Sequence, residues 1–509
     1  MNEMIKSKSI LIILLSLVLF SCYKEETIEQ VIIYDSQYIK ISDVFCSFDN
    51  KKNTFFWPLA TDSIDYFNPF ISYKLNYHSL HFKNNEIVNN NENQFGKIRV
   101  GDTLELIALD NKNIEDTFLL VFTFLPVIEI FTANEIIDEP KKQCFMRIND
   151  PFYKDHGNVV QQFESYAGIE IRGGISQGYP KKSYSVELRY GPESKISNDF
   201  PLLGLRDDDD WILDAMYIDK ARMRNIVSFE IWDEINKGNE VSDKPTIKGE
   251  YIELFINHEY MGVYSLNEKI DQKQLDVQDN LNGFGGYLFK AEEWDIGAVT
   301  FQDYTDTNHT EEWAGWIQEY PDPDVYISWD PLYNLVKFVV ESSDQEFYEK
   351  ISSYIDITSF VNYYIMLNLM CGYDNVGKNT FLYKNSVSEP FKIAPWDMDG
   401  TWGRNWNAGL VGTSDILSNH LYNRLIELNV NMFRDLLKQR WIDLRSGVLT
   451  ESNILELFRN RMHLLKKSNS IIRENLKWDL NLDLENEMLY IESWTYNRLN
   501  FLDSYYEIL

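Results

Sequence analysis

The chain reads IEIRGGISQGYPKKSYSVEL over residues 169–188, and the interpretation of the fold starts from this stretch. Apolar and polar residues alternate on both sides of a glycine-rich turn, which is the period of half-buried strands. Gly173 and Gly174 allow backbone N–H groups to approach an anion, and Lys181 or Lys182 on the second strand is placed to neutralise phosphate charge. The alternative is an ordinary glycine-rich hairpin without a ligand.

A second polar segment follows a predicted helix. Asp356 is a suitable N-cap for that helix, and Gly372 is placed to end it. Asp374 and Asn379 then have the Asp-x-x-x-x-Asn spacing of a kinase catalytic loop, in which the Asp orients the nucleophilic hydroxyl and the Asn holds a metal ion. A polar turn held by local Asp and Asn hydrogen bonds is the alternative.

The third segment is IAPWDMDGTWG, residues 393–403. It predicts a strand that runs into Asp397 and Asp399, and carboxylates two residues apart in an extended chain face the same way. Mg²⁺ favours one or two carboxylates together with phosphate oxygens. Trp396 and Trp402 indicate a packed loop, in preference to a solvated acidic turn.

The three segments follow one another in the order of a protein-kinase site, and further short motifs accompany them. Together they resemble the spore-coat kinase (CotH-like) family over about residues 126–505. The loop Arg172–Ser176 departs from the Arg-Gly-Asn-Ser-Ser often found in that family, and Met398 replaces a usual aromatic residue. The motifs are RGG (172–174) with KKSY (181–184), DWIL (210–213), MRN (223–225), ELFIN (253–257) with GVY (262–264) and EK (268–269), GYL (286–288) with Lys290, NTFLY (379–383) and WDMD (396–399).

The resemblance implies an atypical protein-kinase-like fold that phosphorylates Ser in protein substrates, using ATP and a divalent metal, Mg²⁺ or Mn²⁺. Carried over by position, Asp374 is the catalytic residue, and the metal ligands are Asp397, Asn379 and Asp399. The nucleotide-binding residues implied in the same way are Arg172, Gly173, Gly174, Lys181, Lys182 and Glu268, with Glu268 fixing the lysine.

Residues 1–22 resemble a bacterial lipoprotein signal peptide. Lys6 and Lys8 precede an apolar run at residues 10–20, which is too short for a typical membrane span. Residues 19–22, LFSC, resemble a lipobox, so we expect Cys22 to carry acyl chains that anchor the protein to a membrane. The following YKEE is similar to signals for the outer face of the outer membrane. We therefore expect a cell-envelope lipoprotein, and an ordinary secretory signal is the alternative.

Composition excludes several classes of protein. The 509 residues carry a net charge of −31, which argues against nucleic-acid partners. A 44% hydrophobic fraction with 15% aromatic residues excludes wholesale disorder. The His residues form no HExxH motif. Cys46, Cys144 and Cys371 are too few for a disulfide framework, and we expect buried structural residues.

The predicted fold class is α+β. Residues 23–125 predict a β-sandwich-like stalk domain, with strands near residues 38–41, 97–100 and 103–109. Residues 126–509 predict the CotH-like kinase domain, mixed to about residue 415 and mainly helical after it. Residues 297–324 have no clear period and are interpreted as a lid or an insertion. The predicted helices cover residues 221–236, 421–428, 432–446, 454–475 and 485–505.

Two functions of different class fit this sequence. The first is a lipid-anchored protein kinase with an unidentified protein substrate. The acidic surface of the kinase would favour a basic substrate. The second is a non-catalytic surface adhesion or scaffold lipoprotein that keeps the CotH-like fold, because ATP is scarce outside the cytoplasm; aromatic residues at 292–334 would then offer a carbohydrate platform. A transferase with another phosphorylated donor is a third hypothesis. The kinase hypothesis requires Asp374, Asn379 and Asp397 to converge.

Overall fold

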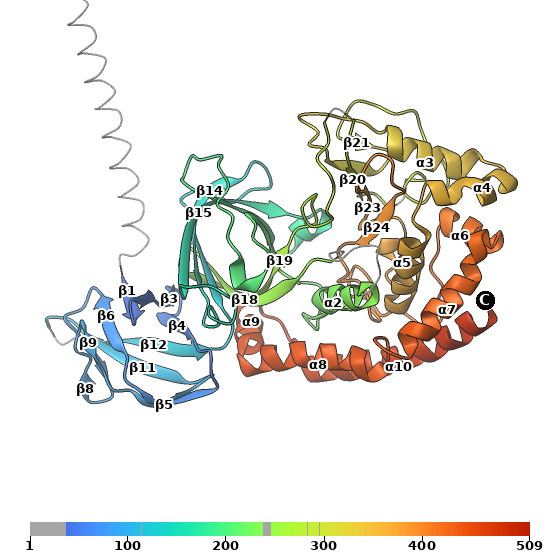
Figure 1. The fold of residues 1–509 in the computed structure, drawn as a ribbon. Helices are drawn as coiled ribbons and strands as arrows, with labels where there is room; N and C mark the ends of the chain where they lie inside the picture. Colours follow the sequence, from blue (N-terminus) through green and yellow to red (C-terminus); the bar gives the residue numbers. More distant parts are fainter. Residues whose placement is uncertain (1–36, 113–114, 238–245, 282, 295) are drawn as a thin grey trace, which may run out of the picture.

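The computed structural model describes residues 37–112, 115–237, 246–281, 283–294 and 296–509. The protein is α+β, as predicted (Figure 1). The predictions for the signal peptide and Cys22 lie outside the described residues. No helix within the described ranges is long and apolar enough to cross a membrane.

Twelve N-terminal strands form three sheets around a core of their own. The sheet orders are β2-β1-β6-β9, β10-β5 and β3-β4-β12-β11-β7-β8. Ile39, Ile98 and Leu106, one from each sheet, meet in that core. The strands predicted at 38–41, 97–100 and 103–109 correspond to β1, β10 and β11. The strands are β1 (Tyr38–Ile41), β2 (Val44–Phe45), β3 (Ser47–Asp49), β4 (Thr54–Pro58), β5 (Ser63–Phe67), β6 (Phe70–Lys74), β7 (Ser79–Phe82), β8 (Asn85–Glu86), β9 (Asn91–Glu92), β10 (Gly96–Arg99), β11 (Thr103–Leu109) and β12 (Glu115–Thr123).

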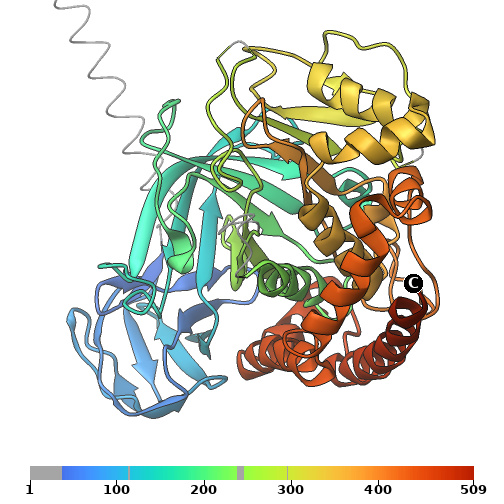
Figure 2. The same cartoon turned by 45° about the vertical axis from the view of Figure 1, so that its right-hand side comes forward.

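A closed barrel follows, in the strand order β13-β14-β15-β16-β17-β19-β18. Adjacent strands of the barrel are antiparallel, except that β13 and β18 pair in parallel and close it. Ile128, Ile169 and Leu213 fill its interior. Figure 2 shows the barrel beside the N-terminal strands, and Phe56 and Phe255 pack across that junction. The strands are β13 (Val127–Phe131), β14 (Lys142–Asn149), β15 (Gln162–Arg172), β16 (Ser183–Arg189), β17 (Asp210–Asp214), β18 (Gly249–Ile256) and β19 (Glu259–Glu268).

Beyond the barrel lies an antiparallel sheet of strand order β21-β22-β20-β23-β24, which packs with the helices and is called the second sheet. The C-terminal helices run along one side of the molecule, and α9 reaches back to the barrel, where it packs on β19 (Figure 1). These elements are β20 (Tyr287–Ala291), β21 (Glu312–Trp313), β22 (Trp316–Tyr320), β23 (Thr380–Lys384), β24 (Lys392–Pro395), α2 (Arg224–Asn236), α3 (Asp330–Glu341), α4 (Asp344–Lys350), α5 (Ile357–Met370), α6 (His420–Glu427), α7 (Phe433–Arg445), α8 (Glu451–Lys467), α9 (Ser470–Trp478) and α10 (Leu484–Ile508).

Some helix ends differ from prediction for local reasons. The Asp356 side chain caps α5 as predicted, but Cys371, with φ of 55°, ends that helix instead of Gly372. The single helix predicted at 454–475 is divided into α8 and α9, because Asn469 takes a left-handed conformation (φ 56°). The helix predicted from residue 221 begins at Arg224, where the Asp219 carboxylate accepts the backbone N–H of Met223.

Three of the four tryptophans in the predicted carbohydrate platform at residues 292–334 are inaccessible to a ligand. Trp313, Trp316 and Trp329 are buried in the main core and do not face solvent. Residues 297–324 therefore contribute packed structure, including β21 and β22. Cys46, Cys144 and Cys371 are buried, as expected, and all three are free thiols.

Candidate functional site

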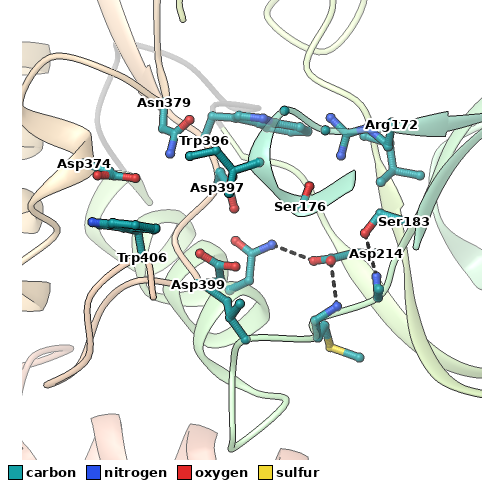
Figure 3. A pocket seen from close by; sticks show the side chains of 18 of the residues that line it. Arg172, Ser176, Ser183, Asp214, Asp374, Asn379, Trp396, Asp397, Asp399 and Trp406 are labelled. Atoms are coloured by element: carbon teal, nitrogen blue, oxygen red, sulfur yellow. Dashed lines mark hydrogen bonds between the residues drawn. The ribbon is translucent and has the colours of Figure 1, made fainter. Parts of the chain in front are cut away.

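A cavity of about 500 Å³ opens between the barrel and the second sheet (Figure 3). Segments far apart in the sequence line it. The structure brings together eight of the predicted site residues there: Arg172, Gly173, Gly174, Lys181, Asp374, Asn379, Asp397 and Asp399. Lys182 and Glu268 are not among its lining residues.

The glycine-rich loop connects β15 to β16 at the edge of this cavity. Gly173 has a φ of 100°, and a Cβ there would lie 2.0 Å from the Ser176 Oγ, so the turn requires glycine. The Arg172 guanidinium lies over the Trp396 ring, 5.5 Å from its centroid. The loop is thereby placed opposite the segment that carries Asp397.

Lys181 is fully buried in the wall of the cavity. Its Nζ donates to Glu474 Oε1 and Oε2 at 2.8 and 3.0 Å, and also to the carbonyl oxygen of Val263. Burial lowers the pKa of Lys181 to about 8, although the Glu474 carboxylate opposes this shift. The Lys182 ammonium instead donates to the carbonyl oxygens of Gln177 and Tyr179 in the loop. Of the two lysines, only Lys181 is among the residues that line the cavity.

The prediction that Glu268 fixes this lysine is wrong. The Glu268 carboxylate accepts the backbone N–H groups of Arg206 and Lys248, at 2.9 Å each, and so ties together strand connections of the barrel. Glu474 of α9 takes the predicted role. Its carboxylate also accepts Arg222 Nε at 3.1 Å.

The segment after α5 places Asp374 and Asn379 in the cavity. The side chain of Asn375 donates to the carbonyl oxygens of Asn379 and Trp396, at 3.1 and 2.8 Å. This fastens the Asp374 segment to the end of β24, which leads to Asp397. Burial raises the pKa of Asp374, and the nearby charge of Lys378 partly offsets the rise.

Asp397 and Asp399 both reach the cavity, but by a different geometry from the predicted extended strand. β24 ends at Pro395, and Asp397 has a left-handed φ of 49°. Asp397 is solvent-exposed, but desolvation by the surrounding cavity walls raises its pKa to about 6; the charges of Asp214 and Asp374 also raise the pKa, and Arg172 lowers it. The pKa of Asp399 is raised well above its usual range, first by burial and then by Asp397. These carboxylates therefore repel one another and favour a cation.

Sequence reasoning missed a further carboxylate, that of Asp214 at the end of β17. It lines the cavity and accepts the backbone N–H of Met216 at 2.9 Å and the Asn225 amide at 3.0 Å. The Asn225 Oδ1 in turn accepts the backbone N–H of Met398 at 2.9 Å. Asp214 directly follows the DWIL motif and Asn225 is the last residue of MRN, so these motifs could have indicated both residues. Asn225 links two acidic segments of the site.

Two more lysines line the cavity and were not predicted as site residues. Lys290 on β20 forms an ion pair with Glu292 at 2.6 Å. Lys378 directly precedes Asn379, and in the described part of the chain it forms no ion pair with a carboxylate. Its position beside Asp374 in a catalytic-loop motif is a signal that sequence reasoning could have used.

The donors fit a hard cation that keeps part of its own coordination shell. Asp199, Asp208 and Asp209 are the one group of three carboxylates within 4.8 Å of one another among the described residues, and they lie outside the cavity. Arg206 and Lys273 already pair with Asp208 there. The cavity carboxylates are more widely spaced, which suits Mg²⁺ or Mn²⁺ completed by water and phosphate oxygens.

A glycine-rich loop, a buried lysine–glutamate pair and a cluster of carboxylates thus meet at one cavity. The sequence pattern of the CotH kinase protein family matches residues 169–502, a span that contains every one of these elements. The chain therefore belongs to the CotH kinase protein family, as the sequence motifs predicted. It is also similar to the inner spore coat protein H of Bacillus subtilis (strain 168), with 23% identity over 283 residues, which cover 55% of this chain and 70% of that protein.

Proposed function

We propose that this protein is an atypical protein kinase of the cell envelope, which transfers the γ-phosphate of ATP to Ser in a protein substrate. The observation that carries the proposal is the convergence of Asp374, Asn379 and Asp397 with the glycine-rich loop on one cavity. Family membership supports it, because the family is described as kinase proteins.

Each residue has a role that follows from its surroundings. The glycine-rich loop offers backbone N–H groups to the phosphates, and Lys181, held by Glu474, supplies fixed positive charge behind them. Asp397, Asp399 and Asn379 would hold Mg²⁺ or Mn²⁺, which neutralises charge on the β- and γ-phosphates when bound. Lys378 adds a positive charge on the side of Asp374.

The transfer step is an in-line displacement. The acceptor hydroxyl oxygen forms a bond to the γ-phosphorus while the bond from that phosphorus to the bridging oxygen of ADP breaks. Asp374 orients the hydroxyl and accepts its proton, and burial helps, because the raised pKa makes the carboxylate a better base. Fixed charges aimed at the transferring oxygens supply the remaining stabilisation.

The proposed location rests on the signal segment and on the relative. We propose that Cys22 carries the lipid anchor and that the protein is an outer-membrane lipoprotein. A spore-coat relative is consistent with a role at the cell surface. Substitution of Cys22 by Ser should abolish labelling by a fatty-acid analogue and release the protein from the membrane fraction.

The test of the kinase is incorporation of label from γ-labelled ATP with Mn²⁺ into Ser. Asp374→Ala and Asp397→Ala should each lower the rate by roughly 10²–10⁴-fold. The matched control is Asp199→Ala, an acidic residue outside the cavity, which should transfer normally. Failure to bind nucleotide at millimolar ATP would leave the second candidate, a non-catalytic scaffold that keeps this fold.

A further inference from the structure

Two half-exposed tryptophans flank the Asp374 segment at the mouth of the cavity. Trp294 and Trp406 are 49% and 47% exposed, and both line the cavity. The Trp294 indole N–H donates to the carbonyl oxygen of Tyr373, the residue before Asp374, at 3.2 Å. Figure 3 shows the Trp406 ring beside the Asp374 carboxylate. Exposed aromatic side chains that gather at a cavity typically mark a binding surface.

The loop that carries Trp406 is firmly built. Arg404 donates from Nε and Nη2 to the Glu487 carboxylate at 2.6 Å each, and from Nη1 to the Ala408 carbonyl at 2.8 Å. Glu487 is held by buried Arg224 at 2.6 Å. The Asn405 side chain accepts the backbone N–H of Gly409 at 2.8 Å and closes the turn. The fold therefore holds the Trp406 indole half-exposed at the wall of the cavity that contains Asp374, which is a costly arrangement for a side chain without a ligand.

The in-line geometry of phosphate transfer determines whether the nucleotide or the acceptor lies next to the two tryptophan rings. The acceptor oxygen and the leaving oxygen lie on opposite sides of the γ-phosphorus. Asp374 belongs to the acceptor side, and the glycine-rich loop and Lys181 belong to the nucleotide side. Both tryptophans belong to the part of the cavity that holds Asp374: Trp294 is hydrogen-bonded to Tyr373, and Trp406 lines the same cavity as Asp374.

We propose that Trp294 and Trp406 form the acceptor subsite, which grips an extended polypeptide with an apolar or aromatic residue next to the phosphorylated Ser. This inference rests on the proposed kinase activity and adds the class of acceptor. Tryptophans in such positions carry a large share of binding energy at protein interfaces. Their flat faces suit aromatic and aliphatic side chains, and the cavity between them leaves Asp374 open to the hydroxyl.

The experiment compares Ser-centred peptides that place Gly, Leu or Phe beside the Ser, with the full chain as enzyme. Trp406→Ala and Trp294→Ala should each raise KM for the Leu and Phe peptides roughly 5–30-fold, with little change in kcat or in the KM for ATP. Trp406→Phe should keep most of the affinity. The matched control is Tyr496→Ala, a similarly exposed aromatic on α10 outside the cavity.

Equilibrium binding of the same peptides to Asp374→Asn with a non-hydrolysable ATP analogue makes the test independent of turnover. If the wild type transfers no phosphate, the proposed kinase activity is wrong. The peptide affinities still show whether Trp294 and Trp406 bind the residue beside the Ser. Loss of ATP-analogue affinity in Trp406→Ala would show that the rings hold the nucleobase and would overturn the inference. Equal affinity of all peptides for the wild type and both Trp variants would overturn it too.

Discussion

Lys181 and Glu474 form a fully buried ion pair of 2.8 Å, although 293 residues separate them in the sequence. The Glu474 carboxylate also accepts Arg222 and the backbone N–H of Val263. Gly262 leaves the necessary space, because a Cβ there would lie 2.3 Å from Glu474 Oε2. Helix α9 is therefore part of the wall that supports the glycine-rich loop, and the C-terminal helices are required for the site.

Substitution of Glu474 by Gln should lower the free energy of unfolding by roughly 3–5 kcal/mol, because Lys181 and Arg222 would stay buried without a counter-charge. Urea denaturation measures this loss. Glu485→Gln is the matched control, because Glu485 pairs with Lys466 on the exposed surface and should cost less than about 1 kcal/mol. Equal losses in the two variants would contradict the role of the buried pair.

Lys181→Met separates stability from catalysis. The Arg222–Glu474 pair survives in this variant, so we expect a smaller loss of stability than in Glu474→Gln. Transfer should still fall by about 10²-fold or more, because the fixed charge behind the phosphates is gone. Activity close to wild type would exclude Lys181 from the nucleotide site.

Lys378→Ala should lower kcat about 10²-fold with little change in stability. The side chain lines the cavity beside Asp374, and in the described ranges no carboxylate pairs with it, so its charge is available to the transferring oxygens. Initial rates at saturating ATP measure the effect, and Lys378→Arg should restore part of it. Lys350→Ala, which removes an exposed lysine paired with Glu346 outside the cavity, is the control and should leave kcat nearly unchanged.

Local patterns predicted those features of the fold that local forces decide. The alternation at Thr103–Leu109 predicted β11 correctly, because alternate side chains of that strand face the core. The Asp356 cap of α5 was confirmed because capping involves neighbouring residues only. The helix end at Cys371 was missed, because glycine is only the commonest residue in that conformation and not a requirement.

The candidate site was predicted less completely, because its partners meet through tertiary packing. Asp374, Asp397 and Lys181 stand in motifs, and the structure places all three in the cavity. Glu474 stands in a helix with other charged residues, where sequence alone indicates an exposed face; its burial depends on α9 packing against β19. The tertiary fold therefore selected Glu474 over Glu268 as the partner of the lysine.

Asn225→Ala should weaken Mn²⁺ binding about 10–100-fold, because Asn225 joins the Asp214 carboxylate to the backbone of Met398 between the two acidic residues. Isothermal titration calorimetry measures this affinity. Asn236→Ala offers a control in the same helix: its side chain is also buried and hydrogen-bonded, to Trp232 and Asn362, but lies outside the cavity. A similar loss of affinity in both variants would show a general effect of damage to α2.

Asp397→Asn should stabilise the metal-free protein at neutral pH, because the raised pKa of Asp397 reflects the cost of desolvating its carboxylate and of placing it near other carboxylates. Between its ordinary pKa, roughly 4, and the folded value of about 6, the native state binds more protons than the unfolded state. The free energy of unfolding therefore falls as pH rises through this window. Above about pH 6 we expect the free energy of unfolding of the variant to exceed that of the wild type by about 1 kcal/mol. This is less than the full pKa shift would give, because solvent in the cavity screens the charges.

Thermal unfolding with a chelator, at about pH 8 and about pH 4, tests this sign. The variant should melt a few degrees higher at the upper pH, and the difference should disappear at the lower pH, where the wild-type carboxyl is protonated. Added Mn²⁺ should raise the melting temperature of the wild type more than that of the variant, because binding to the native state alone stabilises it. A variant less stable than the wild type at neutral pH without metal would mean that Asp397 has a structural role, and the cation site would have to be reassigned to Asp214 and Asp399.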